Sequence, residues 1–490
     1  MLDGFTPWPE EEAARYRRAG YWQGRTFGDL LRDPAREQGK RTALVHGDSR
    51  MTYAQLNRRV DRTAAGLRLR GIRPGNRVVV QLPNVPEFVV TVFALFRTGA
   101  IPVFAPVAHR AAEIGHLVRT TGAVGYVGPT SYGGFDHAGM AARISAEFPF
   151  LRRVFTWSGT GTPAGGFSVS SDGCLSFPLS SIDAPPEPDP PLDAGSVAFF
   201  LVAGSPLAGS PLADTPPSGS PPSGSPPSGS PPPGSPPPGS PLSAGTAVRP
   251  ELIPRTHDDY AYQTRATGEL LGLSREDVYL ATLPAESNFA FGCPGIVGTL
   301  AAGGTVVLIE NPGPAEAFRA IERERVTFTS LTPGIAAQWR DALPAATEDL
   351  SSLRVMQIGG APLHHAPAER LPPGFGCRIQ QVYGMAEVLL SATRLDDAED
   401  TVLGTRGRPV SPADEIRIDA PAGQTGRAAQ EGETGQPGEL LARGPHTFRG
   451  YYKADAHNAR AFTSDGFYRT GELARLDAHG NLIVQETSQA

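Results

Sequence analysis

The chain has 490 residues, of which 40% are hydrophobic and 19% charged, a composition that excludes a wholly disordered protein. Its formal net charge of −6 offers no basic surface for nucleic acid, and no apolar run approaches the roughly 20 residues of a membrane helix. Three scattered cysteines exclude a disulfide framework and the first residues lack a signal-peptide pattern, so we expect a reduced, cytoplasmic protein.

Helix-like and strand-like patterns alternate in the first part of the chain. Apolar residues recur at helical spacing within 51–71, and a short apolar run predicts a buried strand at 77–82. An apolar helix is expected at 86–99 and another strand at 101–105. Strands that alternate with helices are typical of an α/β fold with largely parallel sheets, so residues 1–204 are predicted to form a first α/β subdomain.

A proline-rich tandem repeat interrupts this pattern. Residues 205–245 contain 15 prolines, and seven pentads of the PPSGS type begin at Pro206. Such pentads add little apolar area and Pro removes backbone donors, so we expect an exposed coil with polyproline II character. The two flanks of this insertion are predicted to lie together at a sheet edge. The alternative is a docking site for a partner domain, although no basic or aromatic anchors interleave the prolines.

The α/β rhythm returns after the repeat and later changes to a different texture. Residues 246–397 are predicted to form a second α/β subdomain, and polar, Gly-rich turns with short strands predict a β-rich subdomain at 398–486. A short tail follows at 487–490. The strands expected in the second α/β subdomain are 278–281, 305–309, 326–330, 355–358 and 379–382.

Three motifs follow one another in the last part of the chain. YGMAE at 383–387 comes after an expected strand, GELLARG at 438–444 leads into RGYYK at 449–453, and YRTGELAR occupies 468–475. Each is a Gly-rich turn with charges and is weak by itself. In this order and spacing they resemble the adenylate-forming superfamily, which contains acyl-CoA synthetases, luciferases and adenylation domains.

Other segments narrow the resemblance to stand-alone aryl-acid–AMP ligases of siderophore assembly. These are FTPWPEEEAARYRRAGYWQG near the start, LIPRTHDDY at 252–260 and VYGMAEVLLSATRLDD at 382–397. The resemblance implies the large α/β domain of this superfamily and a reaction in which ATP, with Mg²⁺, converts salicylate or 2,3-dihydroxybenzoate to an aryl adenylate. It also implies an aryl carrier protein, whose phosphopantetheine thiol then takes the acyl group.

The resemblance assigns a nucleotide and metal site. Glu387 matches the acid that supports Mg²⁺ at the phosphates, and a hard cation prefers oxygen ligands. Glu472 stands where the family has an Asp that binds the ribose hydroxyls, and Arg475 matches an Arg near the ribose. An exposed loop acid and a surface cation are the alternatives for Glu387 and Arg475. The other residues matched to the nucleotide site are Gln381, Val382, Tyr383 and Gly384.

The resemblance also assigns an acid pocket. Asn288 matches the Asn that meets the 2-hydroxyl of the acid, although a backbone partner for its amide is an alternative. Cys293 and Leu390 match two wall positions, and their types favour salicylate because a thiol bonds a 3-hydroxyl weakly and Leu takes up its space. Plain core packing is the alternative for both. Phe289 and the turn Gly359, Gly360 and Ala361 complete the predicted pocket.

The chain departs from the family pattern at the phosphate loop. The expected Gly- and Thr-rich loop that ends in Lys is split by the repeat, and its exit keeps Gly245 and Thr246 but carries Glu251 in place of the Lys. Ser287 replaces a usual His. The family continues into a small domain with a second Lys, which this sequence is expected to lack. We therefore expect a weak or inactive ligase, or alternatively a non-catalytic relative that acts as a ligand-binding or interaction protein.

Overall fold

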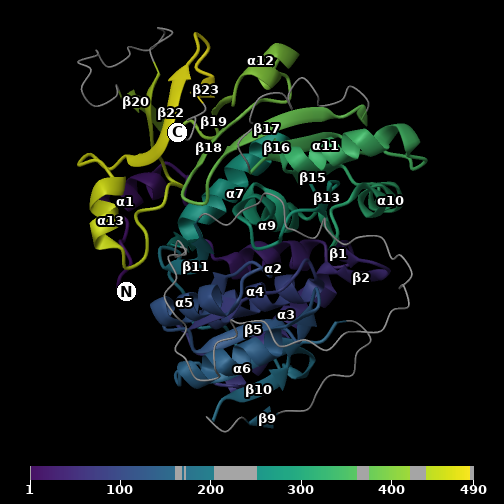
Figure 1. Cartoon of the computed structure of the whole chain (residues 1–490), viewed down its shortest axis with the longest axis vertical. Coiled ribbons are helices and arrows are strands. Elements are labelled where there is room, and N and C mark those ends of the chain that lie inside the picture. The colour runs from purple at the N-terminus through teal and green to yellow at the C-terminus, as the bar shows by residue number, and fades with distance from the viewer. Residues whose placement is uncertain are drawn as a thin grey trace, which may run out of the picture.

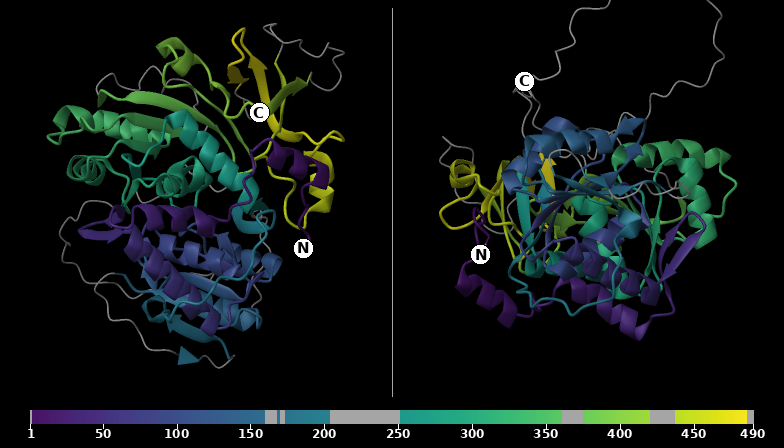
Figure 2. Two further views of the ribbon diagram at one scale, coloured as in Figure 1. Left: turned by 180° about the vertical axis from the view of Figure 1, so that it is seen from behind. Right: turned by 90° about the horizontal axis from the view of Figure 1, so that it is seen from below.

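Two large sheets stack one above the other, and a smaller sheet lies beside them, as Figure 1 and the reverse view in Figure 2 show. Parallel pairing dominates both large sheets, which confirms the predicted α/β class. Every helix in the described part of the chain is too short or too polar to span a bilayer. The computed structural model describes residues 2–159, 168–169, 173–203, 251–360, 375–419 and 437–485.

The eight-stranded sheet is the lower one in Figure 1. Its central strands pair in parallel, and antiparallel strands close its two edges. In spatial order its strands are β12 (Leu252–Thr256), β11 (Val197–Val202), β4 (Ile101–Phe104), β3 (Arg77–Val80), β5 (Gly125–Pro129), β8 (Arg153–Trp157), β10 (Leu175–Pro178) and β9 (Ser168–Val169). The other elements of this part are α3 (Tyr53–Leu69), α4 (Pro86–Thr98), α5 (Ala111–Thr121), α6 (His137–Glu147), a 3-10 turn (Leu179–Ser181) and the hairpin β6 (Ser131–Tyr132) with β7 (Phe135–Asp136).

The nine-stranded sheet is the upper one in Figure 1. Its strands, in spatial order, are β19 (Arg408–Pro409), β18 (Leu389–Ala392), β17 (Arg378–Gly384), β16 (Val355–Gly359), β15 (Phe328–Leu331), β13 (Val278–Ala281), β14 (Thr305–Leu308), β1 (Thr42–His46) and β2 (Ser49–Thr52). The other elements of this part are α2 (Phe27–Glu37), α7 (His257–Leu271), α8 (Asn288–Gly292), α9 (Gly295–Ala302), α10 (Pro314–Glu324), α11 (Pro333–Ala342), a 3-10 turn (Leu343–Ala345) and α12 (Glu399–Gly404).

Local signals explain where the most apolar helix begins and ends. α4 begins at Pro86, whose missing N–H suits a first helical turn. It ends before Gly99, which has a φ of 71° in the left-handed region that glycine adopts without strain. Nearly all of its side chains are buried, so α4 lies inside the molecule and contributes to the largest apolar core.

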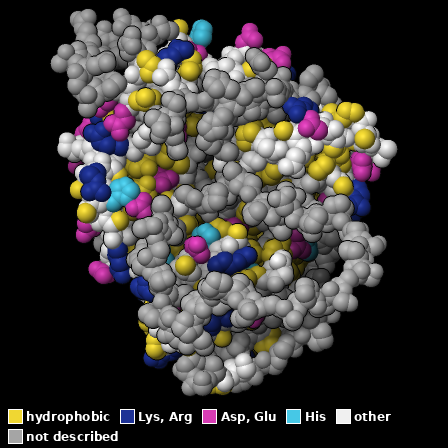
Figure 3. All heavy atoms as spheres, in the orientation of Figure 1, with side chains coloured by type: hydrophobic (Ala, Val, Ile, Leu, Met, Phe, Trp, Pro, Cys, Tyr) yellow, Lys and Arg dark blue, Asp and Glu magenta, His cyan; other side chains and the backbone are white. Residues whose placement is uncertain are grey.

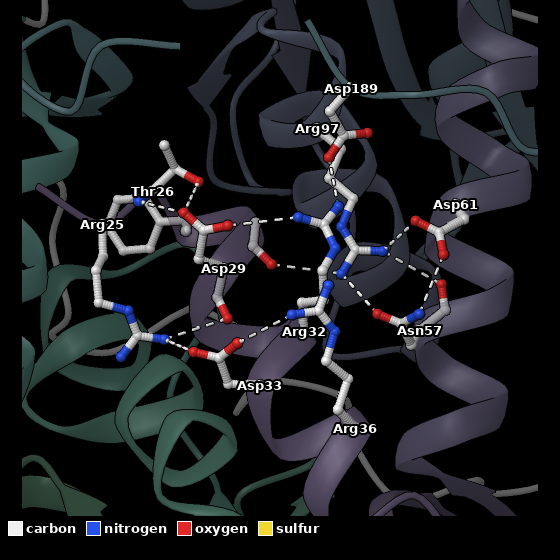
Figure 4. Close-up of polar contacts among 12 residues, drawn as sticks. Arg25, Thr26, Asp29, Arg32, Asp33, Arg36, Asn57, Asp61, Arg97 and Asp189 are labelled. Carbon is white, nitrogen blue, oxygen red and sulfur yellow. Dashed lines mark hydrogen bonds and ion pairs between the residues drawn. The ribbon is translucent and has the colours of Figure 1, made fainter. Parts of the chain in front are cut away.

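A buried cation ties α4 to the helices around it, as Figure 4 shows. The Arg97 guanidinium donates to Asp61 Oδ1 at 2.5 Å and to Asn57 Oδ1 at 2.8 Å, both on α3. Burial lowers the pKa of Arg97, and the Asp61 carboxylate opposes that shift. In the same region Arg32 of α2 pairs with Asp189. Because these cations have carboxylate partners within the protein, we interpret the cluster as support for the helices.

The strands on either side of the repeat form one antiparallel pair. β11 and β12 run from Val197 opposite Thr256 to Val202 opposite Leu252, and Ala203 N donates to Glu251 O at 2.8 Å. β12 is an edge strand of its sheet. This confirms that the flanks of the insertion lie together at a sheet edge, whereas the repeat itself lies outside the described residues.

The four-stranded sheet packs beside the large sheets and holds the N-terminal segment. Trp22 Nε1 donates to Pro445 O at 3.0 Å, and the Arg449 guanidinium lies 5.1 Å from the Trp8 ring. Arg449 also pairs with Glu12 of the N-terminal helix at 3.7 Å, and Figure 1 shows this helix beside α13 (Asp455–Ala461). The other elements are β20 (Glu415–Asp419), β21 (Gly438–Arg443), β22 (Tyr468–Leu476), β23 (Leu482–Gln485) and the N-terminal helix itself, α1 (Glu10–Arg18).

The sheets exchange segments across the predicted subdomain boundaries. β1 and β2, from the start of the chain, pair with β14 in the nine-stranded sheet. β12, which follows the repeat, belongs to the eight-stranded sheet. The boundaries at 204, 246 and 398 stay a prediction, and the exchange shows that the two α/β parts are interlocked.

On the face drawn in Figure 3, dark-blue Lys and Arg side chains are interspersed with magenta Asp and Glu side chains. No basic stripe gathers among the described residues of that face. This distribution matches the slightly acidic net charge of −6.

Candidate active site

Several of the predicted site residues gather at the carboxyl ends of β16 and β17. The two strands pair in parallel with Gly359 opposite Val382, and ligands of open α/β sheets bind outside such strand ends. A Cβ on Gly359 would lie 2.2 Å from Val382 O and 3.3 Å from the Phe289 ring, so only glycine allows this close approach. Gly360 follows with a φ of 77°, which also favours glycine.

The wall of the predicted acid pocket is apolar and neutral. Phe289, Cys293 and Val382 are all buried and belong to one apolar cluster. Burial raises the pKa of the Cys293 thiol to about 12, so the sulfur stays protonated at neutral pH. Of the other predicted wall residues, the Leu390 side chain and Ala361 lie outside the described residues.

The Asn288 side chain is held by three neighbours at the start of α8. Its Oδ1 accepts from Tyr260 Oη at 2.9 Å and from Gln263 Nε2 at 3.1 Å, and its Nδ2 donates to Met385 O at 3.1 Å. The sequence left a ligand and the backbone as candidate partners, and the structure shows the backbone and two side chains. Ser287, where a His was expected, caps α8 because its Oγ accepts from Ala290 N at 3.3 Å.

Sequence reasoning missed the buried cation beside this pocket, Arg255. Its Nε donates to Asp259 Oδ1 at 2.9 Å, and both side chains are excluded from solvent. Its Nη atoms donate to Ala386 O at 3.2 Å and to His446 O at 2.8 Å. Arg255 therefore joins β12 to the YGMAE motif and to the four-stranded sheet. Helical spacing could not have found this pair, because Arg255 lies on β12 and only Asp259 lies on α7.

Glu387 is a buried carboxylate, with 7% of its surface exposed. Its Oε1 accepts from Tyr451 Oη at 2.8 Å, and the Tyr451 hydroxyl lies 3.0 Å from that of Tyr468. Burial raises the pKa of Glu387, and the bond from Tyr451 opposes that shift. The alternative of an exposed loop acid is therefore wrong. The RGYYK motif contains Tyr451, but nothing in the motif indicates that this side chain holds the carboxylate.

A second carboxylate lies near Glu387. The Glu251 side chain is bonded to Nδ1 of His457 on α13, and the His457 ring stacks on Tyr451 with centroids 4.7 Å apart. After burial, the like charge of Glu251 also raises the pKa of Glu387. Gly245 and Thr246, the other residues predicted at the phosphate loop, lie outside the described residues.

The residues predicted to bind the nucleotide are spread over two sheets. Gln381 is buried, and its Oε1 accepts from Arg406 at 2.6 Å, so this side chain serves the packing of β17. The Tyr383 hydroxyl is buried without a hydrogen-bond partner within the described part of the chain. Gly384 lies at an irregularity between β17 and β18. Glu472 and Arg475 lie on β22, and burial raises the pKa of Glu472.

A cavity among the described residues lies apart from the predicted site. It has a volume of about 290 Å³ and lies between α7, α9 and the segment before α2. None of the predicted site residues lines it, and its lining includes Tyr21, Arg265, Gly268, Gly298 and Ala302.

Comparison with known proteins places this architecture in a family. The sequence profile described as AMP-binding enzyme matches residues 31–452. The 2,3-dihydroxybenzoate-AMP ligase of Bacillus subtilis (strain 168) is 41% identical over 485 residues, which cover 99% of this chain and 79% of the relative. The salicyl-AMP ligase / salicyl-S-ArCP synthetase of Mycobacterium tuberculosis is 40% identical over 491 residues, which cover 99% and 76%.

A solved structure agrees with these relatives. The apo structure of MbtA from Mycobacterium smegmatis matches with a TM-score of 0.79 and 37% identity, over 99% of this chain and 80% of that one. The resemblance predicted from the motifs is thereby confirmed. The chain belongs to the AMP-binding enzyme family, and its relatives include aryl-acid–AMP ligases.

Proposed function

We propose that this chain is an aryl-acid–AMP ligase that activates salicylate or 2,3-dihydroxybenzoate with ATP for siderophore or related nonribosomal peptide assembly. The observation that carries the proposal is that Asn288, Gly359 and the YGMAE motif lie together at the carboxyl ends of β16 and β17 in the nine-stranded sheet. A neutral wall therefore lies close to a segment that ends in a buried carboxylate. The names of the two curated relatives support these acids as substrates.

The acid would lie against the neutral wall. In the proposal Asn288 meets its 2-hydroxyl, since an amide N–H suits a phenolic oxygen. Holding the carboxylate in line with the α-phosphorus is the main task of such a site, because a fixed geometry lowers the barrier of a bimolecular step. Phe289, Cys293, Gly359, Gly360, Ala361 and Leu390 would surround the ring.

The residues present suit Mg²⁺ and ATP. Mg²⁺ binds through one or two carboxylates together with substrate phosphates, and Glu387 is a carboxylate fixed by Tyr451. Among the described residues no group of three or more His, Cys, Asp and Glu is placed to hold a metal. When bound, the ion supplies positive charge to the phosphates. Tyr383, whose hydroxyl has no partner among the described residues, would face the nucleoside with Val382, Gly384, Glu472 and Arg475, while the buried Gln381 would support β17 behind them.

The proposal extends to a second step, transfer of the acyl group to the phosphopantetheine thiol of an aryl carrier protein. The name of the mycobacterial relative describes such a product. One observation favours a second candidate function, a binding protein without turnover. The Glu251 carboxylate occupies the place predicted for a phosphate-binding Lys and is paired with His457.

The test separates acid binding from adenylation. Calorimetry of the purified chain should detect salicylate and 2,3-dihydroxybenzoate, and ATP–pyrophosphate exchange should depend on the added acid. Glu387→Gln should lower exchange while acid binding persists, whereas Glu276→Gln, at a side chain 68% exposed, should change neither. Binding without exchange would favour the second candidate, and the absence of both would refute the proposal.

A further inference from the structure

Gln263 lies between the buried cation and the predicted acid pocket. Its side chain is fully buried on α7. Its Oε1 accepts from Arg255 Nη2 at 3.1 Å. Its Nε2 donates to Asn288 Oδ1 at 3.1 Å, and its second hydrogen is shared between Cys293 Sγ at 3.3 Å and Gly292 O at 3.4 Å. Neither composition nor the family resemblance pointed to this residue.

The charge of Arg255 determines how the two amides are turned. A guanidinium has only donors, so Gln263 must face it with its carbonyl oxygen and present its NH₂ to the pocket. Asn288 must then accept the hydrogen bond from Gln263 with its Oδ1, which also accepts one from Tyr260. Burial raises the pKa of Tyr260, which keeps its hydroxyl protonated as a donor. Asn288 Nδ2 is thereby fixed as the outward donor, with one hydrogen on Met385 O and a second for a ligand.

The same amide engages the sulfur at the pocket wall. Cys293 Sγ accepts from Gln263 and donates to Asn288 O at 3.4 Å. A thiol has a single hydrogen, and here it is directed at the main chain. The Cys293 thiol therefore has no hydrogen left to donate to a further hydroxyl on the ring.

We propose that Gln263 is a positioning residue that sets the preference of this pocket for an aryl acid with a single ortho-hydroxyl. It acts through Asn288, which it turns so that an N–H meets that hydroxyl, and through Cys293, whose sulfur it occupies. The inference rests on the proposed function, because it requires an aryl acid in this pocket.

The decisive variant is Gln263→Glu, which keeps the shape of the side chain and its bond from Arg255 but cannot donate to Asn288. Salicylate and benzoate, which differ only in the ortho-hydroxyl, are titrated by calorimetry into the full chain. Salicylate affinity should fall by about threefold to tenfold, the range expected for one net hydrogen bond, while benzoate affinity changes little. The matched control is Thr264→Val on the same helix, whose hydroxyl bonds only Tyr260 O within the described contacts, at 2.8 Å.

Two further measurements exclude a merely structural effect. In an Asn288→Ala background the Gln263→Glu change should leave the salicylate-to-benzoate ratio unaltered, because the coupled partner is gone. If Gln263→Glu does not fold, Gln263→Asn, whose shorter amide cannot reach both partners, should show the same loss. Wild-type binding with an unchanged ratio in the variants would overturn the inference alone. A wild-type chain that binds neither acid would overturn the proposed function, and the inference with it.

Discussion

At the acid end of the candidate site, Asn288 and Cys293 are bonded to neutral neighbours, and the charge of Arg255, which bonds Gln263 behind them, is matched by Asp259. At the phosphate end, the carboxylates of Glu387 and Glu251 lie on either side of Tyr451 and His457. The charges at the acid end are thus balanced within the protein. The phosphate end holds a buried carboxylate, Glu387, whose pKa is raised first by burial and then by the like charge of Glu251.

At the acid end the fold itself supplies the partners of the buried polar groups, whereas at the phosphate end a ligand must supply the cation. A buried polar network costs little when its members are paired, and it then fixes one geometry before any ligand arrives. A buried carboxylate without a cation costs free energy that a bound cation would recover. We therefore expect changes at the acid end to act on stability and selectivity, and changes at the phosphate end to act on nucleotide affinity.

Removing the buried cation Arg255 should have the largest effect, a loss of folding stability. Arg255→Met leaves the Asp259 carboxylate buried without its partner, and breaking such a pair costs about 3–5 kcal/mol of unfolding free energy. Urea denaturation measures the loss. Arg275→Met is the matched control, because Arg275 is 64% exposed beside Glu276 and a surface pair contributes at most about 1 kcal/mol. Equal losses in the two variants would contradict the structural role of Arg255.

A buried carboxyl next to the acid end should make stability depend on pH. Burial raises the pKa of Glu286 to about 8, two residues before Asn288. The folded state then keeps a proton that the unfolded state releases near its ordinary value of about 4.5. This contribution is fully present below pH 4.5 and is lost as pH rises towards 8, by about 1.4 kcal/mol per pH unit at most.

Substituting Glu286 isolates that slope. Glu286→Gln should be more stable than the wild type at pH 8 and close to it at pH 5, as urea denaturation at several pH values would show. The exposed Glu276→Gln control should leave the slope unchanged. A wild-type slope that survives in Glu286→Gln would place the titrating group elsewhere.

Regular periodicity was enough to predict much of the fold. The apolar helix expected at 86–99 is α4 at Pro86–Thr98, and the strand expected at 278–281 is β13. The strand expected at 326–330 is displaced to Phe328–Leu331, because a short apolar run does not mark its own ends. The exchange of β1 and β12 between the sheets was not predicted, because pairing between distant strands leaves no periodic signal.

In the candidate site, too, the sequence predicted some residues and not the contacts between them. Glu387, Asn288 and Cys293 were found from motifs, but their partners were not. Tyr451 reaches Glu387 across 64 residues of sequence, and no pattern within either segment announces that contact. For Gln263 a local signal existed within α7, because Asp259 and Gln263 lie four residues apart on one helix face, whereas Arg255 precedes this helix on β12. That spacing indicates a polar face, whereas its burial depends on the rest of the fold.

Reversing the charge of Glu251 should raise the affinity of the phosphate end for ATP. Glu251→Lys removes the like charge near Glu387 and supplies the cation predicted for a phosphate loop, so ATP affinity should rise by about tenfold, or ~1.4 kcal/mol. Calorimetry with Mg·ATP measures the change. Glu276→Lys alters the net charge equally at an exposed site and should leave ATP affinity unchanged. A rise in both variants would indicate a general electrostatic effect and not a local one.

The smallest expected effect concerns the choice between two acids. The wild type should bind salicylate more tightly than 2,3-dihydroxybenzoate, because the Cys293 hydrogen is directed at Asn288 O and the 3-hydroxyl finds no strong partner. Cys293→Ser supplies a stronger donor and acceptor in less volume, so the preference should narrow by about threefold, the value of a weak net hydrogen bond. Calorimetric titration of both acids gives the ratio. Cys377→Ser, just before β17 and outside the predicted pocket, is the control and should keep the wild-type ratio. Equal affinities in the wild type, or tighter binding of 2,3-dihydroxybenzoate, would contradict the interpretation of Cys293 as a wall that disfavours a second hydroxyl.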